Sequence, residues 1–428
     1  MASTPRPDQA LGIGGYRPKL PAIAFAGMAA VAALPVASVG AAAAPAVAHA
    51  VSGGDFYAPP SPLLSASPGT LIRSQPLVLG GAGVLAPAHK AWSVMYHSRD
   101  ASGHDIAVTG AVLTPTSPWT GAGPRPYVSF GVGTQGLGHQ CAPSRQLAAG
   151  TEYETPNLIA ALDLGYGIAV TDYEGYVTGS TPTYTTGASE AHTVLDVARA
   201  ARQLPGADAS KSTPVGLWGY SQGGGATGWA AALAPRYAPD VKVVGAASGG
   251  VPADLKAVGA NLNGGPGGGL LGDSIVGFAV AYPRLAQFDK LANAAGQQAA
   301  AQLKTECVSD NVAKHAFLDV KNLTKAHLTY PQFVALPGEA AILRMNNLGT
   351  AAAAPKVPVL QYHSLGDELV PLPQAYALHQ TWCAEGVKTT FVGYPGEHLT
   401  GNAVGAPLAL AFLAQRFAGQ PFVSRCPL

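Results

Sequence analysis

The chain carries the run Val215-Gly216-Leu217-Trp218, followed directly by the pentapeptide Gly219-Tyr220-Ser221-Gln222-Gly223. The first run has the length and apolar character of a buried strand, and the Ala-rich stretch Gly224 to Leu233 is typical of a helix. A serine in a sharp turn between a strand and a helix is the pattern of a nucleophile elbow. Small neighbours are needed there because bulky side chains would clash across the strained turn. We therefore predict that Ser221 is a nucleophile.

The chain alternates between short apolar runs and helical patterns on both sides of this turn. Strands are predicted at residues 91–96, 105–113, 126–130, 168–171, 241–247, 357–363 and 389–394, and helices at 155–164, 189–204 and 401–417. The pattern predicts an α/β fold with a mostly parallel sheet, helices on both faces and an antiparallel edge formed by the first two strands. Together with the elbow, it indicates an α/β-hydrolase fold.

Residues 250–352 interrupt the alternation, with helical pieces that are clearest at 283–302 and 309–320. A long helical segment between two strands is typical of an inserted cap or lid. The hydrolase core is then expected in two parts, 51–249 and 353–428, and the first part begins with a Pro/Gly/Ser-rich arm that wraps the surface.

The first fifty residues are expected to be a targeting segment. Arg6, Arg17 and Lys19 precede a run from Leu20 to Ala50 that lacks charged side chains and ends in Ala48-His49-Ala50. This is the pattern of a signal peptide, here residues 1–50, cleaved near Ala50. An uncleaved membrane anchor is the alternative, because the run exceeds about 20 residues. Prolines and weakly apolar alanines within it favour cleavage, and hence a secreted protein.

Composition narrows the class of partner. Charged residues make up 11% of the chain, the formal net charge is +1, and 48% of the residues are hydrophobic. No basic patch suggests nucleic acid, and a large apolar core can form.

An even number of cysteines in an exported chain favours two disulfides, with three possible pairings, over free thiols. The four cysteines are Cys141, Cys307, Cys383 and Cys426. They form no C-x-x-C motif, so a zinc site or a redox site is disfavoured.

A serine hydroxyl needs a general base that is itself oriented by an acid. In this fold the order along the chain is serine, acid and histidine, each at the carboxyl end of a strand. His398 has that position, because it follows the last predicted strand in a turn. The other histidines after the serine fall in the insertion, a strand or a helix: His315, His327, His363 and His379.

Asp367 is predicted to be the acid because it follows the strand at 357–363. Its neighbour Glu368 is one alternative. Glu397, beside the histidine, is a second alternative that fits less well, since it would have to fold back beside its own neighbour. Asp172 ends an earlier strand but precedes the serine in the chain, and we interpret it as structural.

Negative charge that develops on a substrate carbonyl needs backbone N–H donors, which form an oxyanion hole. One donor is expected from Gln222, the residue after the nucleophile. The other is expected from the loop Gly131-Val132-Gly133-Thr134-Gln135-Gly136, whose glycines let a ligand approach the backbone. Thr134 and Gln135 are the candidates, and an ordinary tight loop is the alternative interpretation.

Across most of the mature chain, the sequence resembles the secretory lipase family, the α/β-hydrolase branch of fungi and actinobacteria that includes the yeast lipase A type. The resemblance rests on several motifs together, because each alone is short. They are Asp55-Phe56-Tyr57, Cys141-Ala142-Pro143-Ser144, Thr171-Asp172-Tyr173-Glu174-Gly175, Gly219-Tyr220-Ser221-Gln222-Gly223, Gly366-Asp367, Trp382-Cys383, Tyr394-Pro395 and His398.

The resemblance implies Ser221 as nucleophile, Asp367 as acid and His398 as base, with oxyanion donors at Gln135 and Gln222. It also implies a helical cap over an acyl-binding tunnel, and hydrolysis of triacylglycerols and simpler carboxylic esters. The disulfides that it implies are Cys141–Cys307 and Cys383–Cys426.

The sequence therefore predicts an exported lipase or esterase that forms an acyl-enzyme on Ser221 and needs no metal or organic cofactor. A lipid or ester substrate, met at a lipid–water interface, is expected, with no nucleic acid and no obligate protein partner. An acyltransferase with the same triad is the main alternative. A serine peptidase is disfavoured because nothing resembles a propeller or a peptide-binding extension. A non-catalytic lipid-binding protein would be expected to lose a triad residue, yet all three positions are occupied.

Overall fold

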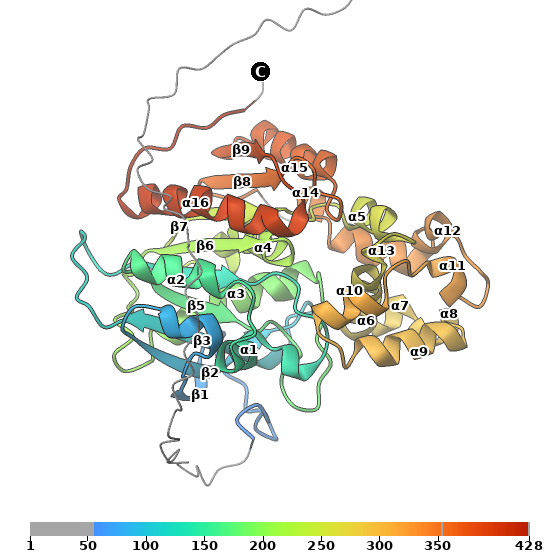
Figure 1. The fold of residues 1–428 in the computed structure, drawn as a ribbon, viewed down its shortest axis with the longest axis horizontal. Helices are drawn as coiled ribbons and strands as arrows, with labels where there is room; N and C mark the ends of the chain where they lie inside the picture. The colour runs from blue at the N-terminus through green and yellow to red at the C-terminus, as the bar shows by residue number, and fades with distance from the viewer. Residues whose placement is uncertain (1–54, 352–353, 427–428) are drawn as a thin grey trace, which may run out of the picture. The chain divides into compact units, whose positions relative to one another are not determined.

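The computed structural model describes residues 55–351 and 354–426, so the predictions for residues 1–50 lie outside the described part. Within it, nine strands form one sheet in the order β1-β2-β3-β5-β4-β6-β7-β8-β9, from bottom to top of Figure 1. The strands are β1 (Leu71–Pro76), β2 (His89–Arg99), β3 (Asp105–Pro115), β4 (Tyr127–Gly131), β5 (Gly167–Thr171), β6 (Val215–Tyr220), β7 (Val243–Gly249), β8 (Val359–Ser364) and β9 (Thr389–Tyr394).

The direction of pairing divides the sheet into two parts. Strands β1, β2, β3 and β5 pair antiparallel in that order, and every later pair, from β5–β4 to β8–β9, is parallel. The predicted mostly parallel sheet with an antiparallel edge is confirmed. Strand β1 was expected to be part of an extended arm, and it forms the edge of the sheet instead. Its polar sequence and terminal proline are compatible with an edge strand, where one row of N–H groups stays unpaired.

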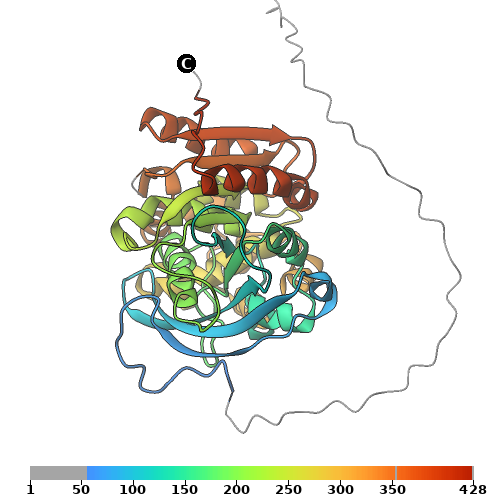
Figure 2. The same cartoon turned by 90° about the vertical axis from the view of Figure 1, so that its left-hand side faces the viewer.

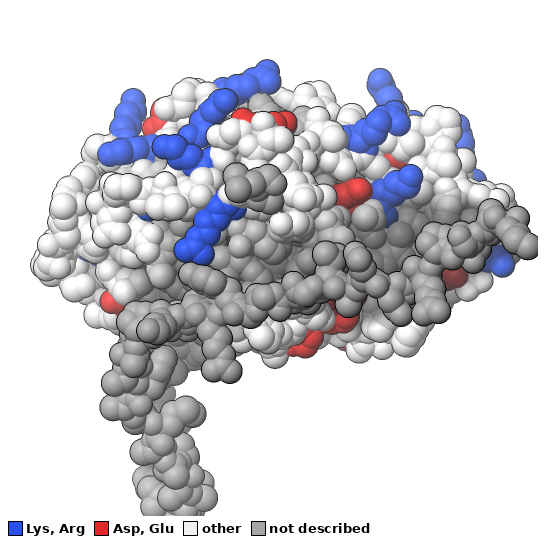
Figure 3. All heavy atoms as spheres, turned by 90° about the horizontal axis from the view of Figure 1, so that it is seen from above, with Lys and Arg blue, Asp and Glu red and all other residues white. Residues whose placement is uncertain are grey.

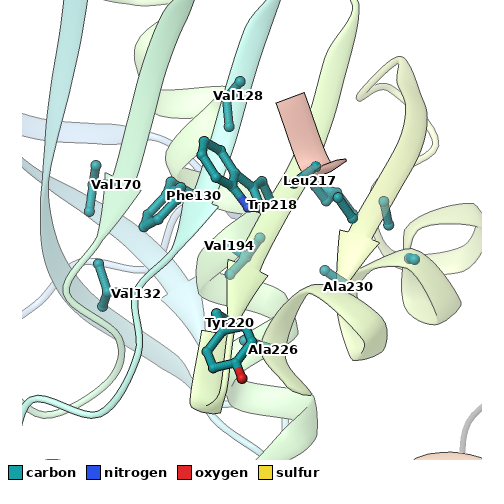
Figure 4. Close-up of a cluster of buried hydrophobic side chains, with 14 of the residues drawn as sticks. Val128, Phe130, Val132, Val170, Val194, Leu217, Trp218, Tyr220, Ala226 and Ala230 are labelled. Atoms are coloured by element: carbon teal, nitrogen blue, oxygen red, sulfur yellow. The ribbon is translucent and has the colours of Figure 1, made fainter. Parts of the chain in front are cut away.

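The central strands are buried on both faces. Every residue of β4, β5, β6 and β8 is buried, as expected for parallel strands covered by helices on each side. Phe130 on β4 and Trp218 on β6 meet edge to face, with ring centroids 5.1 Å apart. Figure 4 shows these rings between strand and helix side chains, including Val194 and Ala226. This packing fixes the carboxyl end of β6, from which Ser221 follows.

Six helices cover the two faces of the sheet. Helices α3 (Gly187–Ala201) and α4 (Gln222–Tyr237) pack on one face together with α15 (Leu372–Ala384). Helices α1 (Pro143–Ala149), α2 (Thr155–Asp163) and α16 (His398–Phe417) pack on the other. Two short 3-10 helices, η1 (Gly81–Leu85) and η2 (His139–Cys141), precede α1. Figure 2 shows the strands and their covering helices from the side.

A helical insertion, defined here as α5 to α14, connects β7 to β8 and is drawn in yellow to orange on the right of Figure 1. Its helices are α5 (Leu255–Leu262), α6 (Gly268–Ala281), α7 (Pro283–Ala286), α8 (Phe288–Leu291), α9 (Ala294–Leu303), α10 (Val308–Lys314), α11 (Val320–Leu323), α12 (Tyr330–Val334), α13 (Pro337–Met345) and α14 (Leu348–Ala351). The single helix predicted at 283–302 is wrong. It breaks into three because Gln287 adopts a left-handed φ of 44° and the Asn293 side chain caps a new helix start.

Two disulfides join distant parts of the described chain. Cys141 in η2 is bonded to Cys307, just before α10, and Cys383 in α15 is bonded to Cys426 near the C-terminus. On the face drawn in Figure 3, most of the visible described surface belongs to uncharged residues, with Lys and Arg side chains scattered over it. Of the helices that the structure describes, none combines the length and the apolar character that crossing a bilayer requires.

Candidate active site

Ser221 occupies a strained turn between β6 and α4. Its φ of 57° and ψ of −122° lie outside the conformations that residues with a side chain normally adopt. A Cβ atom on Gly219 or Gly223 would overlap the backbone carbonyl oxygen of Gly131, so only glycine fits at both positions. The Ser221 N–H donates to the Gly249 carbonyl at the end of β7, at 3.0 Å. These contacts over-determine the turn and hold the serine hydroxyl at the carboxyl edge of the sheet.

His398 and Asp367 reach this serine from the ends of β9 and β8. The Nε2 atom of His398 lies 2.8 Å from the Ser221 Oγ, and its Nδ1 atom lies 2.7 Å from Asp367 Oδ2. His398 is the first residue of α16, and its ring packs against the ring of Tyr220, with centroids 5.2 Å apart. The structure therefore brings together the three residues that the sequence predicted as nucleophile, base and acid.

The carboxylate of Asp367 is fully buried and held by its own turn. Its Oδ1 accepts hydrogen bonds from the backbone N–H groups of Leu369 (3.1 Å) and Val370 (2.7 Å), which leaves Oδ2 for His398. These two hydrogen bonds fix the orientation of the carboxylate. The ring of His363 also lies close to this carboxylate, with Nε2 3.4 Å from Asp367 Oδ2.

His363 is a neighbour that sequence reasoning did not connect to the site. Its Nε2 donates to the Val370 carbonyl at 2.9 Å, and burial lowers its pKa, so the ring is neutral near neutral pH. Because the His363 ring is neutral, it does not compensate the negative charge of Asp367, and this charge interacts with His398. The sequence signal that could have connected His363 to the site is its position at the end of β8, four residues before Asp367.

The two alternative acids have other contacts. Glu368 accepts a hydrogen bond from the backbone N–H of His398 at 3.1 Å. Glu397 caps α16, because its carboxylate accepts from the N–H groups of Thr400 (2.7 Å) and Leu399 (2.8 Å). The Thr400 side chain and then these backbone N–H groups lower the pKa of Glu397. Both carboxylates thus support the start of the helix that carries His398, whose ring is bonded to Asp367.

The predicted oxyanion donors lie on both sides of the serine turn. Gln222 is the first residue of α4, and its side-chain Nε2 donates to Glu190 Oε1 at 2.8 Å. The side chain of Gln135 turns to the Gly133 carbonyl (3.2 Å), and the hydroxyl of Thr134 lies 2.6 Å from that of Tyr184. Among the described residues, no acceptor is hydrogen-bonded to the backbone N–H of Thr134, Gln135 or Gln222.

A buried pair of carboxyl groups supports the loop at residues 131–136, and sequence reasoning missed it. Glu154 Oε2 accepts from the Gly133 N–H at 2.6 Å, and its Oε1 accepts from the Asn402 side chain in α16 at 2.8 Å. Glu152 lies beside the Gln135 side chain, at 3.4 Å. Burial raises the pKa of both carboxyls, and the charge of Glu152 raises the pKa of Glu154 further. The pair connects the predicted oxyanion loop to the helix that carries His398.

Ser221 and His398 open into a largely apolar cavity of about 720 Å³, including the part that opens to solvent. Gln222 also lines it, whereas Thr134 and Gln135 do not. The far wall consists of side chains from the helical insertion: Leu255, Val258, Leu262, Leu270, Leu271, Ile275, Phe278, Tyr330, Phe333, Val334, Glu339 and Leu343. Within the described residues, no group of three His, Cys, Asp or Glu side chains is arranged as a metal site.

Comparisons with known proteins identify the family of the chain. The model of the secretory lipase family matches residues 142–425. A protein named "Probable inactive lipase" from Mycobacterium tuberculosis is 31% identical, covering 86% of this chain and 82% of its own length, and Lipase 4 of Candida albicans is 29% identical, covering 87% and 82%. The crystal structure of Candida antarctica lipase A in its closed state matches with a TM-score of 0.77 and 28% identity, covering 87% of this chain and 88% of that one. With a family match over more than half of its length, the chain belongs to the secretory lipase family.

Proposed function

We propose that this protein is a secreted serine lipase or esterase that hydrolyses triacylglycerols and other carboxylic esters through an acyl-enzyme on Ser221. The observation that carries the proposal is the connected pair of short contacts, Ser221 Oγ to His398 Nε2 at 2.8 Å and His398 Nδ1 to Asp367 Oδ2 at 2.7 Å. Both contacts lie within the range that proton transfer requires. Lipases and esterases among its relatives and structural neighbours support the same reaction class.

In the acylation step, Ser221 Oγ attacks the ester carbonyl carbon while His398 Nε2 takes the serine proton. Asp367 holds the Nδ1 proton, which fixes the tautomer and stabilises the imidazolium that forms. The carbonyl oxygen becomes negative and is bound by the N–H of Gln222 and by an N–H of Thr134 or Gln135. The tetrahedral intermediate then collapses, its C–O bond breaks, and His398 protonates the departing alcohol.

Deacylation repeats these steps with water as the attacking group. His398 Nε2 takes a proton from water, the resulting hydroxide attacks the acyl carbon, and Ser221 leaves as an alkoxide that regains the proton from His398. The apolar wall of the insertion provides the surface against which a long acyl chain lowers its contact with water. We propose on this basis that the helical insertion is a cap over an acyl-binding site. Residues 51–249 and 353–428 then form the catalytic core.

The test compares Ser221→Ala with Ser212→Ala, a matched change of an exposed serine that precedes β6, at the end of the strand opposite to the turn. Hydrolysis of a p-nitrophenyl ester is expected to fall by at least about 10³-fold in Ser221→Ala and to stay unchanged in the control. Equal melting temperatures would show that both variants are folded. Retained hydrolysis in folded Ser221→Ala would refute the proposal.

Transfer of the acyl group to an alcohol instead of water is the alternative within the same mechanism. The two activities differ only in the second nucleophile, so the measurement is product analysis after adding a primary alcohol to the ester assay. A majority of free acid supports the hydrolase, and a majority of the new ester at low alcohol concentration supports the acyltransferase.

We also propose that the protein is exported and loses residues 1–50. Support comes from the apolar, uncharged run that ends at Ala50 and from the secretory character of the family. The intact mass of the protein recovered from the culture medium of a bacterial expression host tests this. A chain that begins near Val51 is expected, and a full-length chain retained in the membrane fraction would contradict the proposal.

A further inference from the structure

Glu339 is a carboxyl group without a protein partner in an apolar cavity wall. It lies in the first turn of α13 and is 7% exposed. Among the described residues that line the Ser221 cavity, it is the only carboxylic acid, and no described residue forms a hydrogen bond or an ion pair with it. Burying a carboxyl group without a partner costs several kcal/mol, roughly, so its position calls for a physical explanation.

Glu339 lies in a wall that two cavities share. A second cavity of about 560 Å³, including the part that opens to solvent, lies within the insertion, and its lining is otherwise apolar except for Thr324. Glu339, Ile275 and Phe333 line both this cavity and the one that contains Ser221. An acyl chain that extends from Ser221 along this part of the insertion therefore meets the carboxyl group of Glu339 in the shared wall.

The carboxyl group remains accessible to such a molecule. Its oxygens are not fully enclosed by protein, and Glu339 lines the cavity that contains Ser221. Burial raises the pKa of Glu339 to about 7, which leaves a large neutral fraction near neutral pH. A neutral carboxyl group both donates and accepts a hydrogen bond, and a carboxylate accepts one. In either state it can pair with a hydroxyl group.

A structural role of Glu339 would be to support the start of α13. An acidic residue in the first turn interacts favourably with the helix dipole, by about 0.3 to 1 kcal/mol. That gain is available to an exposed side chain, and the exposed Asp310 in the first turn of α10 is an example within the same insertion. Burial of Glu339 in the wall between the two cavities costs free energy, and the interaction with the helix dipole does not offset this cost.

We propose that Glu339 is a specificity-determining residue that binds a hydroxyl group part-way along the acyl chain, so that hydroxylated acyl esters are preferred substrates. This rests on the proposed function, because the chain must be bound as an ester at Ser221. A hydroxyl fits better than an amine, since a cationic amine would lose its hydration among the apolar side chains that line the path. The hydroxyl satisfies the carboxyl group that otherwise has no partner.

The experiment measures kcat/KM for methyl hexadecanoate and for a positional series of methyl monohydroxyhexadecanoates in detergent micelles. For at least one hydroxyl position, the wild type is expected to prefer the hydroxylated ester by about tenfold or more, as for a hydrogen bond to a buried carboxyl group. Glu339→Leu is expected to abolish or invert that preference, and Glu339→Gln to retain part of it. Each preference is the ratio of kcat/KM for two esters measured with the same preparation. It can therefore be measured even if part of the variant protein is inactive.

Asp310→Leu, which changes an exposed first-turn carboxylate of the insertion, is the matched control and should keep the wild-type ratio. The inference is overturned if no hydroxyl position is preferred by the wild type, or if Glu339→Leu keeps the preference. Hydrolysis of methyl hexadecanoate without a hydroxyl preference would refute this inference alone. Failure of the wild type to hydrolyse any of the esters would instead refute the proposed function.

Discussion

Ser221 and Glu339 face one cavity from two regions that are built differently. The nucleophile frame, defined here as β6, Ser221, α4 and the loop at residues 131–136, is held by backbone contacts so close that glycine is required. The helical insertion has close glycine contacts of its own, for example at Gly338, but packed side chains form its wall towards Ser221. One cavity lies between this wall and the frame, and the second lies within the insertion. Backbone contacts fix atoms precisely, whereas side-chain packing can change with the sequence. The comparison suggests that reaction chemistry resides in the frame and substrate choice in the insertion.

The largest effect is expected where the frame meets its acid. Asp367→Asn keeps an oxygen for the Val370 N–H but removes the charge that orients His398, so kcat should fall by about 10³- to 10⁴-fold. Glu368→Gln is the control. The Glu368 carboxylate accepts from the backbone N–H of His398 and not from its ring, so a loss below about tenfold is expected. Steady-state kinetics of both variants provides the measurement. Similar losses in the two would assign the role of acid to the pair rather than to Asp367.

The next effect contrasts one glycine from each region. In Gly223→Ala the new methyl group would overlap the Gly131 carbonyl, and neither backbone can move freely, so a loss of about 3 kcal/mol in unfolding free energy is expected. In Gly272→Ala, within α6, the methyl would lie 2.7 Å from the end of the flexible Leu303 side chain. Relief of that contact and the better helix propensity of alanine should leave stability within about 1 kcal/mol.

Chemical denaturation of both glycine variants measures these differences. If Gly272→Ala is as destabilising as Gly223→Ala, the two regions are equally rigid and the comparison fails.

The disulfides give the third contrast. Cys141–Cys307 joins η2 to the insertion across 166 residues, whereas Cys383–Cys426 spans 43 residues outside it. Replacing either pair by serines should cost about 2 to 4 kcal/mol, with the larger cost for the longer loop. Only loss of Cys141–Cys307 is expected to speed proteolysis within the insertion. Limited proteolysis followed by mass mapping would show this, and cleavage of the insertion in both variants would contradict it.

The smallest effect concerns pH and the buried pair that supports the frame. Burial raises the pKa of Glu152 and Glu154, so the folded chain holds more protons than the unfolded chain above the ordinary glutamate range. The pair is therefore least destabilising in mild acid, and stability is lost as the pH rises through the folded pKa values. Glu154→Gln cannot ionise, so relative to the wild type its melting temperature should rise by a few degrees, roughly, between pH 5.5 and pH 9. A difference that is independent of pH would contradict this account.

Sequence predicted the frame better than the insertion, for a physical reason. Strand β6, the serine turn and α4 depend on local patterns, namely a short apolar run, small residues and an alanine-rich helix. The break at Gln287 depends on a backbone conformation that no local pattern marked, and β1 depends on pairing with β2 across an intervening turn.

The contacts that sequence missed are those made by the fold. Glu154 meets Asn402 only because α2 and α16 pack on the same face of the sheet. Glu339 reaches the cavity only because α13 packs against the other helices of the insertion. No spacing along the chain places either residue next to the serine, whereas Asp367 and His398 follow strand ends that could be counted in order.

The central claim is that one serine in the frame is activated by His398 and Asp367. The most direct test is to incubate the folded wild-type protein with a fluorophosphonate and to map the modified residue by peptide mass spectrometry. Our account predicts one phosphonyl group per chain, located on Ser221, and slow labelling after Asp367→Asn. Labelling at another residue, or an unmodified Ser221 in folded protein, would contradict it.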